Sequence, residues 1–341
     1  MDKEKTTIGT LRGGDGSPVE DDAAKAELLL NHFKTVLNPE SVIDDHNLPG
    51  IEPRIEDLRI TEMDVADGIN SLNNTNATGP DKIKVQILKK CQQVLIKPIT
   101  HIINLVYNTG QEPSKWKHYH VIPLYKNKGD KQDVKNYRPI SLASNVKKVM
   151  EHIILKHVRK YAIDHNLIPS NQHGFMPLHN CESALFSHTL TLQSANENNR
   201  PTCVVYLDQS AAFDKCDFGR IGEMLHQSGI TGKTGKYIKE WLTNRTQSVI
   251  VNDVITTPSP VTSGVPQGSK LAPFIFILYV APMVTHLRST IKQYADDITL
   301  TCFADDQSEI RNLEQDTEDI FLWGQERGLV FNPTKSCHII Y

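Results

Sequence analysis

The chain has 341 residues, of which 39% are hydrophobic and 23% charged, so disorder over its whole length is excluded and about two domains are permitted. Its 37 basic and 40 acidic residues give a net charge of −3. This total does not show whether the chain binds nucleic acid, although local clustering of charge still can. None of the six cysteines stands in a C-x-x-C pair, which excludes zinc ribbons and thioredoxin-like motifs and is typical of a reducing, intracellular compartment.

The N-terminal segments predict two helices joined by a linker. Residues 1–20 are polar and rich in glycine, lack the apolar core of a signal peptide, and predict a loose lead-in. Apolar residues at helical spacing predict one helix over Asp21–Leu37, beginning at an Asp-Asp cap, and another over Thr61–Leu72, capped by its first residue. The acidic residues and prolines of 38–60 indicate a linker between them.

A basic segment follows a turn-rich loop and a further helix. Residues 73–80 predict the loop, and Val85–Asn108 predicts the helix. Residues 113–160 then hold twelve Lys or Arg residues against three acids, a local net charge of +9 in a chain that is acidic overall. Two interpretations are open: a solvated helix face and a surface that contacts phosphates.

Shorter apolar strands lie in the second half of the chain, with helices between them. The expected strands are Cys203–Leu207, Ser248–Val251 and Thr299–Cys302, and the expected helices are Phe218–His226 and Gln307–Trp323. The longest apolar run, Leu271–Val284, contains two prolines and is shorter than the roughly 20 residues that span a bilayer, so we expect a helix and no membrane partner. The element order predicts an α+β fold. The scattered cysteines and the lack of a signal-peptide core predict an intracellular protein, in the nucleus or cytoplasm.

Two acidic sites stand at strand ends. The apolar run Val204–Leu207 ends in Asp208, where a carboxylate is held rigidly at a sheet edge, although Asp is also a favoured helix cap. Alternating apolar residues around Asp296 and Asp297 predict a β-hairpin with the acidic pair at its tip, which is also a common inert turn. Together the two sites can converge on two divalent ions about 3.5–4 Å apart, as in phosphoryl transfer. Hard oxygen ligands suit Mg²⁺.

A tight loop lies between these acidic sites. In Ser263–Ser269 two glycines surround a Pro-Gln pair, and Gly268 leaves room for a ligand or template to approach the backbone. The alternative is an ordinary surface turn before the apolar helix. The sequence holds no Walker A motif, which disfavours NTPases of that class.

The order of these motifs resembles a known polymerase family. One set of motifs in this chain resembles the palm of a reverse transcriptase. It consists of Asp208 with Phe213 and Asp214, GVPQGSKLAP at 264–273, YADD at 294–297 and NPTK at 332–335. A second set of motifs, further upstream, is similar to the fingers of non-LTR, LINE-type retrotransposon enzymes. It consists of GPDKI at 79–83, IPLYKNKGD at 122–130, NYRPISL at 136–142 and QHGF at 172–175. Residues Ile8–Leu37 resemble the connector before the polymerase of jockey-like elements.

The resemblance implies a right-hand polymerase with an α+β fold. Its parts would be a helical N-terminal extension over residues 1–75, fingers over 76–200 that include the basic segment 113–160, and a palm over 201–341. Compared with the family, we expect the chain to stop before the primer grip and thumb and to lack the endonuclease. The implied partners are an RNA template, a DNA primer and deoxynucleoside triphosphates.

The resemblance also implies metal ligands and a sugar gate. Asp208 and Asp296 would bind two Mg²⁺ ions, with Mn²⁺ as an alternative metal, and Asp297 would support them. The main-chain carbonyl of Gln209 would be a further ligand. Phe213 would be the steric gate against a ribose 2′-hydroxyl, and its alternative is a core aromatic residue.

Further matching positions are implied to bind the nucleotide. Gln267 and Gly268 would line the incoming deoxynucleotide. Lys126 and Arg138 would hold its triphosphate, because ammonium and guanidinium groups match phosphate oxygens. Lys335 would lie near the leaving pyrophosphate as a proton donor, and its alternative is a solvated loop lysine.

Three positions depart from the family pattern. Met176 and His179 stand where arginines are expected after QHGF, which bears on the grip of the template strand. Lys270 stands where an apolar residue is commoner. Asp81 and Asp214 match the family pattern, and we expect them to have structural roles.

The sequence thus supports three functions to different degrees. The first is an RNA-directed DNA polymerase that transfers deoxynucleotides to a primer 3′-OH by a two-metal route. The second is an inactive retroelement remnant that retains at most RNA binding. The third is a metal-dependent phosphotransferase of another class, which the Pro-Gln-Gly loop and the NYRPISL motif disfavour.

Overall fold

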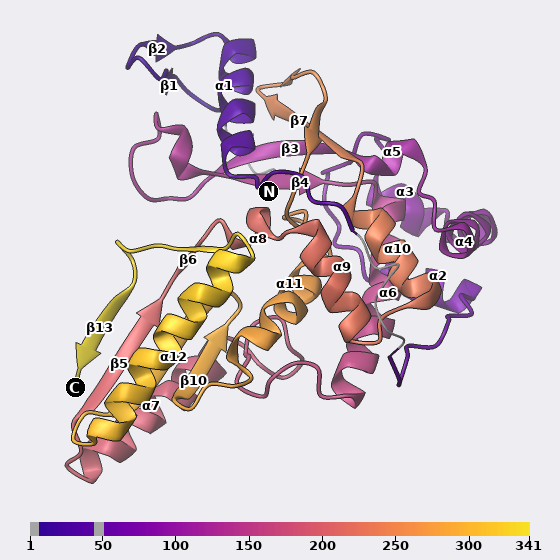
Figure 1. The fold of residues 1–341 in the computed structure, drawn as a ribbon. Helices are drawn as coiled ribbons and strands as arrows, with labels where there is room; N and C mark the ends of the chain where they lie inside the picture. The colour runs from indigo at the N-terminus through magenta and orange to yellow at the C-terminus, as the bar shows by residue number, and fades with distance from the viewer. Residues whose placement is uncertain (1–6, 44–50) are drawn as a thin grey trace.

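The computed structural model describes residues 7–43 and 51–341 and mixes helices with strands, which confirms the α+β class (Figure 1). The helices are α1 (Asp22–Thr35), α2 (Glu62–Asn70), α3 (Val85–Lys90), α4 (Gln92–Thr109), α5 (Ser114–Lys117), α6 (Asn145–Asp164), α7 (Cys181–Glu197), α8 (Ala212–Lys215), α9 (Phe218–Gln227), α10 (Gly232–Leu242), α11 (Ala272–Val280) and α12 (Gln307–Glu326), with 3₁₀ turns at Val134–Asn136 and Ala281–Val284. The strands are β1 (Leu11–Arg12), β2 (Pro18–Val19), β3 (His118–Tyr125), β4 (Tyr137–Leu142), β5 (Thr202–Leu207), β6 (Gln209–Ser210), β7 (Arg245–Val251), β8 (Val254–Ile255), β9 (Ser259–Val261), β10 (Thr290–Tyr294), β11 (Asp297–Phe303), β12 (Val330–Phe331) and β13 (Cys337–Ile340).

One sheet of four antiparallel strands forms the lower left lobe in Figure 1, in the order β10-β11-β5-β13. The central strand β5 is rich in β-branched and aromatic residues, which pack well on a pleated surface. Its register is fixed on both sides, since Leu207 pairs with Ile298 of β11 and Tyr206 pairs with Cys337 of β13. Helix α12 lies across this lobe in the same view.

A second sheet forms the upper lobe, in the order β4-β3-β7-β8 with β9 also paired to β7. Strands β3 and β7 are parallel and the other pairs are antiparallel. Helix α1 packs on this sheet because its apolar residues recur at helical spacing, and Leu29 and Phe33 are buried with Val121 and Val249 in a small core. Asp21 caps the helix by accepting the Ala24 amide at 2.8 Å.

The main core is built largely by helices, among them α2, α4, α6, α9, α10 and α11, and it continues into β5 and β11 of the four-stranded sheet. Helix α11 is apolar on every side, and side chains such as Phe274 and Phe276 are fully buried, as expected for a helix surrounded by protein. No helix within the described residues is long and apolar enough to cross a membrane.

Most predicted elements are confirmed. The predicted helices Asp21–Leu37, Thr61–Leu72, Phe218–His226 and Gln307–Trp323 are α1, α2, α9 and α12, and the predicted strands Cys203–Leu207, Ser248–Val251 and Thr299–Cys302 lie in β5, β7 and β11. Thr61 caps α2 in a capping box with Asp64, each side chain binding the other residue's amide. The predicted hairpin is β10–β11, with Asp296 in its turn and Asp297 opening β11 rather than lying at the tip.

Two predicted helices are interrupted. The helix predicted over Val85–Asn108 is two helices, α3 and α4, because the backbone leaves helical geometry at Cys91. The helix predicted over Leu271–Val284 changes from α to 3₁₀ after Val280, where Pro282 has no amide hydrogen to donate.

The prediction of a loose N-terminal lead-in is wrong for residues 7–20. These residues form the β1–β2 hairpin, and Arg12 donates to Asp130 at 2.9 Å and to Gln132 at 3.1 Å. Of the predicted linker 38–60, residues 44–50 lie outside the described part of the chain. The rest of the linker is irregular but anchored, since Ile55 and Ile60 are buried in the main core.

Candidate active site

The sheet register brings three charged side chains into one row. Continuing the β5–β11 pairing one residue beyond Leu207 and Ile298 places Asp208 opposite Asp297. Continuing the β5–β13 pairing to the other side places Asp208 opposite Lys335. Because strand-end residues are fixed by the ladder that precedes them, both carboxylates and the ammonium group lie at one edge of the four-stranded sheet.

Lys335 binds Asp208 directly. Its Nζ lies 2.9 Å from one carboxylate oxygen of Asp208 and 3.1 Å from the other. The same loop holds the Asp208 backbone, since the Asn332 amide donates to the Asp208 carbonyl at 2.7 Å and the Asp208 amide donates to Ser336 Oγ at 3.3 Å. Lys335 thus combines features of both interpretations made from the sequence. It is half exposed, as a solvated loop lysine would be, and it is bound to the predicted metal ligand, as a residue of the site would be.

Asp296 and Asp297 lie in an environment that opposes their negative charge. Burial raises the pKa of Asp296, and the neighbouring carboxylates of Asp297 and Asp208 raise it further. Burial and the charge of Asp208 likewise raise the pKa of Asp297, while Lys335 lowers it. The protein thus concentrates negative charge at this edge beyond what Lys335 balances.

This donor set fits a divalent cation. Carboxylate oxygens are the ligands that Mg²⁺ prefers, and a cation at this edge would relieve the repulsion that raises the pKa values of Asp296 and Asp297. Among residues 7–43 and 51–341, no group of three His, Cys, Asp or Glu side chains is already arranged to hold an ion. Gln209 lies beside Asp208 in β6, with its side chain buried and its amide 3.8 Å from Met283 Sδ.

The turn that carries Asp296 is held by Gln172, which the sequence analysis missed. Gln172 is buried, and its Oε1 accepts the Gly174 amide at 2.8 Å and the Ala295 amide at 2.9 Å. Ala295 has a φ of +58°, so the turn is strained for an alanine and depends on such contacts. A Cβ on Gly174 would lie 2.4 Å from the Ala295 nitrogen. The QHGF motif was the available signal, and its contact with the acidic turn is tertiary.

The Pro-Gln-Gly loop lies between α8 and β4, so the surface-turn interpretation does not describe it. The Val265 amide donates to the Phe213 carbonyl at 2.8 Å, and the Ser141 amide of β4 donates to the Gln267 carbonyl at 2.6 Å. Gly268 has a φ of +118°, and a Cβ there would lie 2.6 Å from the Ser141 carbonyl oxygen. Gly268 is therefore required both by conformation and by close approach.

Asp214 supports the same loop. Gln267 Nε2 donates to Asp214 Oδ2 at 2.8 Å. Burial raises the pKa of Asp214 to about 6, and the hydrogen bond from Gln267 and the nearby charges of Arg245 and Lys126 oppose this effect. Asp81, also expected to be structural, accepts the Ile83 amide at 3.1 Å within its own turn.

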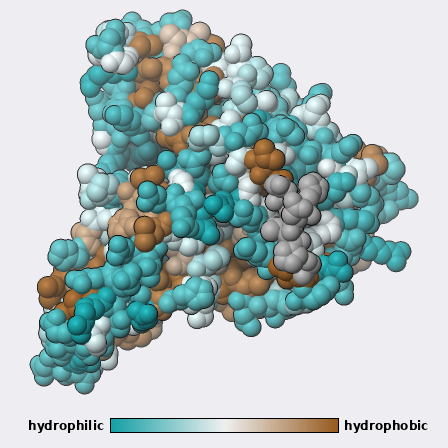
Figure 2. All heavy atoms as spheres, viewed as in Figure 1, coloured by the Kyte–Doolittle hydropathy of each residue, from teal (hydrophilic) through white to brown (hydrophobic). Residues whose placement is uncertain are grey.

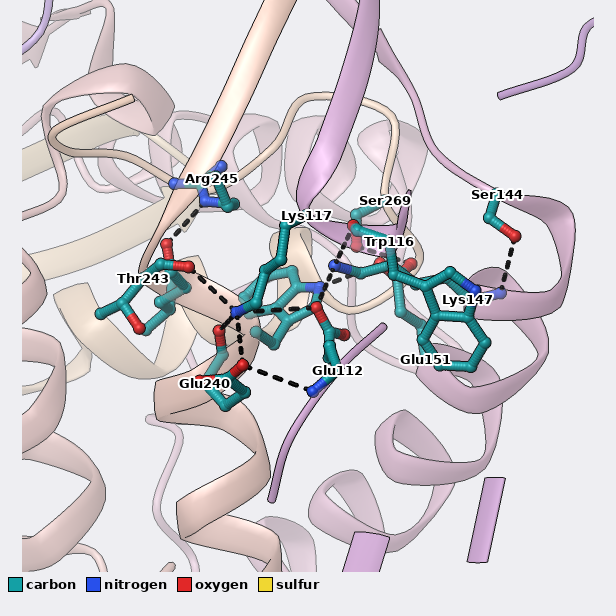
Figure 3. A network of polar contacts seen from close by, with 12 residues as sticks. Glu112, Trp116, Lys117, Ser144, Lys147, Glu151, Glu240, Thr243, Arg245 and Ser269 are labelled. Carbon is teal, nitrogen blue, oxygen red and sulfur yellow. Dashed lines mark hydrogen bonds and ion pairs between the residues drawn. The ribbon is translucent and has the colours of Figure 1, made fainter. Parts of the chain in front are cut away.

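Two buried charged residues anchor the ends of the loop. Arg245 donates to the carbonyls of Ser263 and Gly264 at its start. Glu151 accepts the Ser269 hydroxyl at 2.8 Å and the Lys270 amide at 3.0 Å at its end. Figure 3 shows Arg245, Glu151 and Ser269 in one polar network with the residues around Glu112 and Lys147.

Phe213 lies beside this loop and stacks on the core. Its ring is 4.6 Å from that of Phe276 at an interplanar angle of 20°, and 6.2 Å from that of Phe175 in an edge-to-face arrangement. Phe276 is fully buried, whereas Phe213 is half-buried and Phe175 is partly exposed. This position is compatible with either of the two interpretations of Phe213.

Two basic residues of the second sheet region, Lys126 and Arg138, lie near each other, and Lys126 also lies near Lys335. Lys126 follows β3, and Arg138 lies in β4 opposite Leu124. Partial burial lowers the pKa of Lys126, and the positive charges of Arg138 and Lys335 lower it further. Figure 2 shows a mostly hydrophilic face whose outline is notched between the upper and lower left lobes.

The departures from the expected pattern have structural partners. Lys270 donates to the Ser71 carbonyl at 2.9 Å and to its hydroxyl at 2.6 Å, at the C-terminal end of α2 where a cation is favourable. The His179 ring packs edge-to-face on His173 at 4.8 Å, and Met176 packs against the main core. Met176 and His179 therefore act in local packing around the QHGF segment.

The chain is similar to known proteins in sequence and in fold. Residues 126–340 match the family described as reverse transcriptase (RNA-dependent DNA polymerase). The "RNA-directed DNA polymerase from mobile element jockey" of Drosophila melanogaster is 24% identical over 319 residues, covering 89% of this chain and 34% of that protein. The "Probable RNA-directed DNA polymerase from transposon BS" of the same species is 23% identical over 353 residues, covering 96% of this chain and 38% of that protein.

The chain thus spans between 34% and 38% of the length of these two relatives. A solved structure of apo telomerase from Candida tropicalis, truncated from its C-terminal domain, has a TM-score of 0.48 at 11% identity. That similarity covers 76% of this chain and 56% of the telomerase chain.

Proposed function

The chain belongs to the reverse transcriptase (RNA-dependent DNA polymerase) family and is related to the polymerases of the jockey, BS and X-element transposons, and from this premise we propose that it catalyses RNA-directed DNA synthesis. In this proposal the four-stranded sheet and the loop Ser263–Ser269 form the palm. The sheet around β3 and β4 belongs to the fingers. The substrates are a primed RNA template and deoxynucleoside triphosphates.

The row formed by Asp208, Asp297 and Lys335, with Asp296 in the adjacent turn, carries the proposal. A strand ladder fixes these groups, so they can act on a reacting phosphate without reorganising first. Carboxylates alone would repel a triphosphate. The cations Lys126 and Arg138, whose elements face the same region, supply the opposite charge.

In the proposed reaction the primer 3′-OH loses its proton to solvent, its oxygen forms a bond to the α-phosphorus of the nucleotide, and the bond from that phosphorus to the leaving pyrophosphate breaks. Asp208 and Asp296, with Asp297 and the Gln209 carbonyl, would hold two Mg²⁺ ions, which when bound supply Lewis-acid stabilisation of the attacking and leaving oxygens. Lys335 would move from Asp208 toward the leaving pyrophosphate and donate a proton to it.

The remaining residues of the proposal position the nucleotide. Lys126 and Arg138 would bind its phosphates as ammonium and guanidinium groups. Gln267 and Gly268 would line the base and sugar, because the loop that contains them is held against β4 and α8. Phe213 would close the space beneath the sugar.

Primer extension tests the proposal. The 341-residue protein is mixed with an oligo(dT) primer on a poly(rA) template, dTTP and Mg²⁺. Extension that depends on the template and on the divalent ion supports the proposed function. Tight binding of the primed template with no extension under Mg²⁺ or Mn²⁺ would instead support the inactive remnant.

Removing either fingers cation should weaken nucleotide binding selectively. Lys126→Ala and Arg138→Ala should each raise the KM for dTTP about tenfold, since a charge-assisted hydrogen bond contributes about 1.5–3 kcal/mol. The Kd for the primed template should change less. Lys128→Ala is the matched control, because Lys128 is an exposed lysine of the same loop. Equal KM values in all three variants would contradict the triphosphate role.

Phe213→Val should admit ribonucleotides. If the ring closes the space beneath the sugar, its loss should shrink the deoxy-over-ribo ratio of kcat/KM by roughly 10–200-fold. If Phe213 only fills the core, the ratio should persist while the melting temperature falls, because truncating a buried Phe costs up to about 3–5 kcal/mol. Phe186→Val, at an aromatic residue 66% exposed on α7, is the control for both measurements.

A further inference from the structure

Asn38, in the segment after α1, binds three separate parts of the chain. Its backbone amide donates to Ser263 Oγ at 2.8 Å, and its carbonyl accepts the Thr262 hydroxyl at 2.7 Å. Its side-chain Nδ2 donates to the Lys215 carbonyl at 2.6 Å and to the Gly328 carbonyl at 3.4 Å. One residue of the N-terminal extension thus uses four hydrogen bonds to join segments more than 170 positions away in the sequence.

Each of these segments leads into the candidate site. Thr262 and Ser263 open the loop that ends in Gln267 and Gly268. Lys215 ends α8, which contains Phe213.

The third segment is the turn between α12 and β12. It contains Gly328, and the chain continues from it to the loop that carries Lys335. Gly328 has a φ of +68°, and a Cβ there would lie 2.5 Å from Asn38 Nδ2, so the turn and the asparagine are closely fitted.

The helix before Asn38 also backs the same loop. Phe33 and Leu37 line a small cavity of about 30 Å³ together with Asp214, Arg245 and Gln267. Helix α1 is itself fixed by its packing on β7 and β8. The part of the extension from α1 to Asn38 therefore lies behind the loop, and Asn38 forms hydrogen bonds to it.

We propose that Asn38 is a positioning residue for the nucleotide-binding loop, and that the N-terminal extension is part of the active centre rather than a connector. This inference rests on the proposed roles of Gln267 and Gly268 in binding the deoxynucleotide. Without the Asn38 side chain, α8 and the α12–β12 turn lose their common partner. The loop keeps its bonds to the Asn38 backbone, but α8, to which Gly264 and Val265 are bonded, is held less firmly, so the loop samples more conformations. A less ordered loop binds the nucleotide more weakly, whereas the positions of the carboxylates at the end of β5 do not change.

The experiment compares Asn38→Ala with Asn31→Ala in the full chain. Asn31 is exposed on α1, so the control removes the same side chain from the same extension. Hydrogen exchange is measured at the amides of Gly264 and Val265, which donate to the Cys216 and Phe213 carbonyls at 2.7 and 2.8 Å. Exchange should be about tenfold faster in Asn38→Ala than in the control.

Steady-state primer extension gives the second readout. Asn38→Ala should raise the KM for dTTP about tenfold and change kcat less than about twofold, with the Kd for the primed template unchanged. Thr262→Val removes the hydrogen bond from the Thr262 hydroxyl to the Asn38 carbonyl and should also raise the KM for dTTP. A purely structural role would lower the melting temperature and leave KM unchanged.

The two outcomes are separable. If the wild-type protein does not extend a primer, the proposed function fails, and hydrogen exchange alone decides the role of Asn38. If loop exchange and KM in Asn38→Ala equal those of Asn31→Ala, the positioning role is overturned, whether or not the protein is a polymerase.

Discussion

Replacing Asp208 or Asp296 with alanine should reduce Mg²⁺-dependent primer extension by at least about 10³-fold while leaving the fold intact. Asp208→Ala removes a carboxylate from the charged row at the end of the four-stranded sheet, and Asp296→Ala removes one from the adjacent turn. The double variant should be no worse than either single one, because residues that act as a unit are strongly non-additive. Single-turnover extension measures the effect.

Stability provides an independent check on these variants. Burial raises the pKa of Asp296, so its ionised form is unfavourable in the folded protein, and Asp296→Ala should raise the melting temperature at neutral pH. Asp305→Ala, at an exposed carboxylate that pairs with Arg200 on the surface, is the matched control and should keep its activity. DNA synthesis by the Asp208→Ala variant at the wild-type rate would contradict the assignment of the metal ligands.

Glu112→Ala should destabilise the protein by about 3–5 kcal/mol, which is a large part of the stability of an ordinary domain. Glu112 and Lys147 both have fully buried side chains, and their charged atoms lie 2.8 Å apart. Lys147 also donates to the Trp116 carbonyl at 3.0 Å and lies 5.0 Å from the centre of the Tyr119 ring. Figure 3 shows this pair inside the polar network of the core. Loss of the carboxylate leaves a buried ammonium group without its counter-charge.

Urea unfolding at neutral pH measures the free energy of unfolding of this variant. The surface pair of Arg220 and Glu223 is the matched control, since both side chains are about two-fifths exposed and Glu223→Ala should cost less than about 1 kcal/mol. Replacing both buried partners together, as Glu112→Leu with Lys147→Met, should recover much of the loss because no charge is then left unpaired. A loss below about 1 kcal/mol in Glu112→Ala would show that the pair is not needed.

The sequence predicts the acidic sites well because their signals are local. An apolar run that ends in Asp208, and an alternating pattern around Asp296, both follow from the period of a strand. The partner of Lys335 could not be predicted, because it depends on how β13 pairs with β5 about 130 residues away. Lys335 therefore has two interpretations in the sequence and a specific contact with Asp208 in the structure.

Residues that support the site could be predicted least. Gln172 has no chemical signal of its own, and its role arises only when its carboxamide meets the Ala295 amide 123 positions later. Asn38 lies in a stretch that predicts a linker, because composition reports the average solvation of a segment and not the tertiary bonds of one side chain. The N-terminal hairpin could not be predicted for a different reason: its strands have two residues each, which is too few for a recognisable period.

The packing of α1 on β7 has a consequence for synthesis on the ribosome. The apolar residues of α1 are buried against Val249 and Val251, which are translated about 220 residues after Phe33. At roughly 5–20 residues per second, the apolar face of α1 waits about 10–45 s for its partner strand. Val121 of β3 and Tyr137 of β4 belong to the same small core, are translated earlier and can cover part of this face. Until β7 follows, the rest of the apolar face stays uncovered, a form that chaperones bind and that aggregates readily. Packing of this helix is thus completed only after β7 has been synthesised.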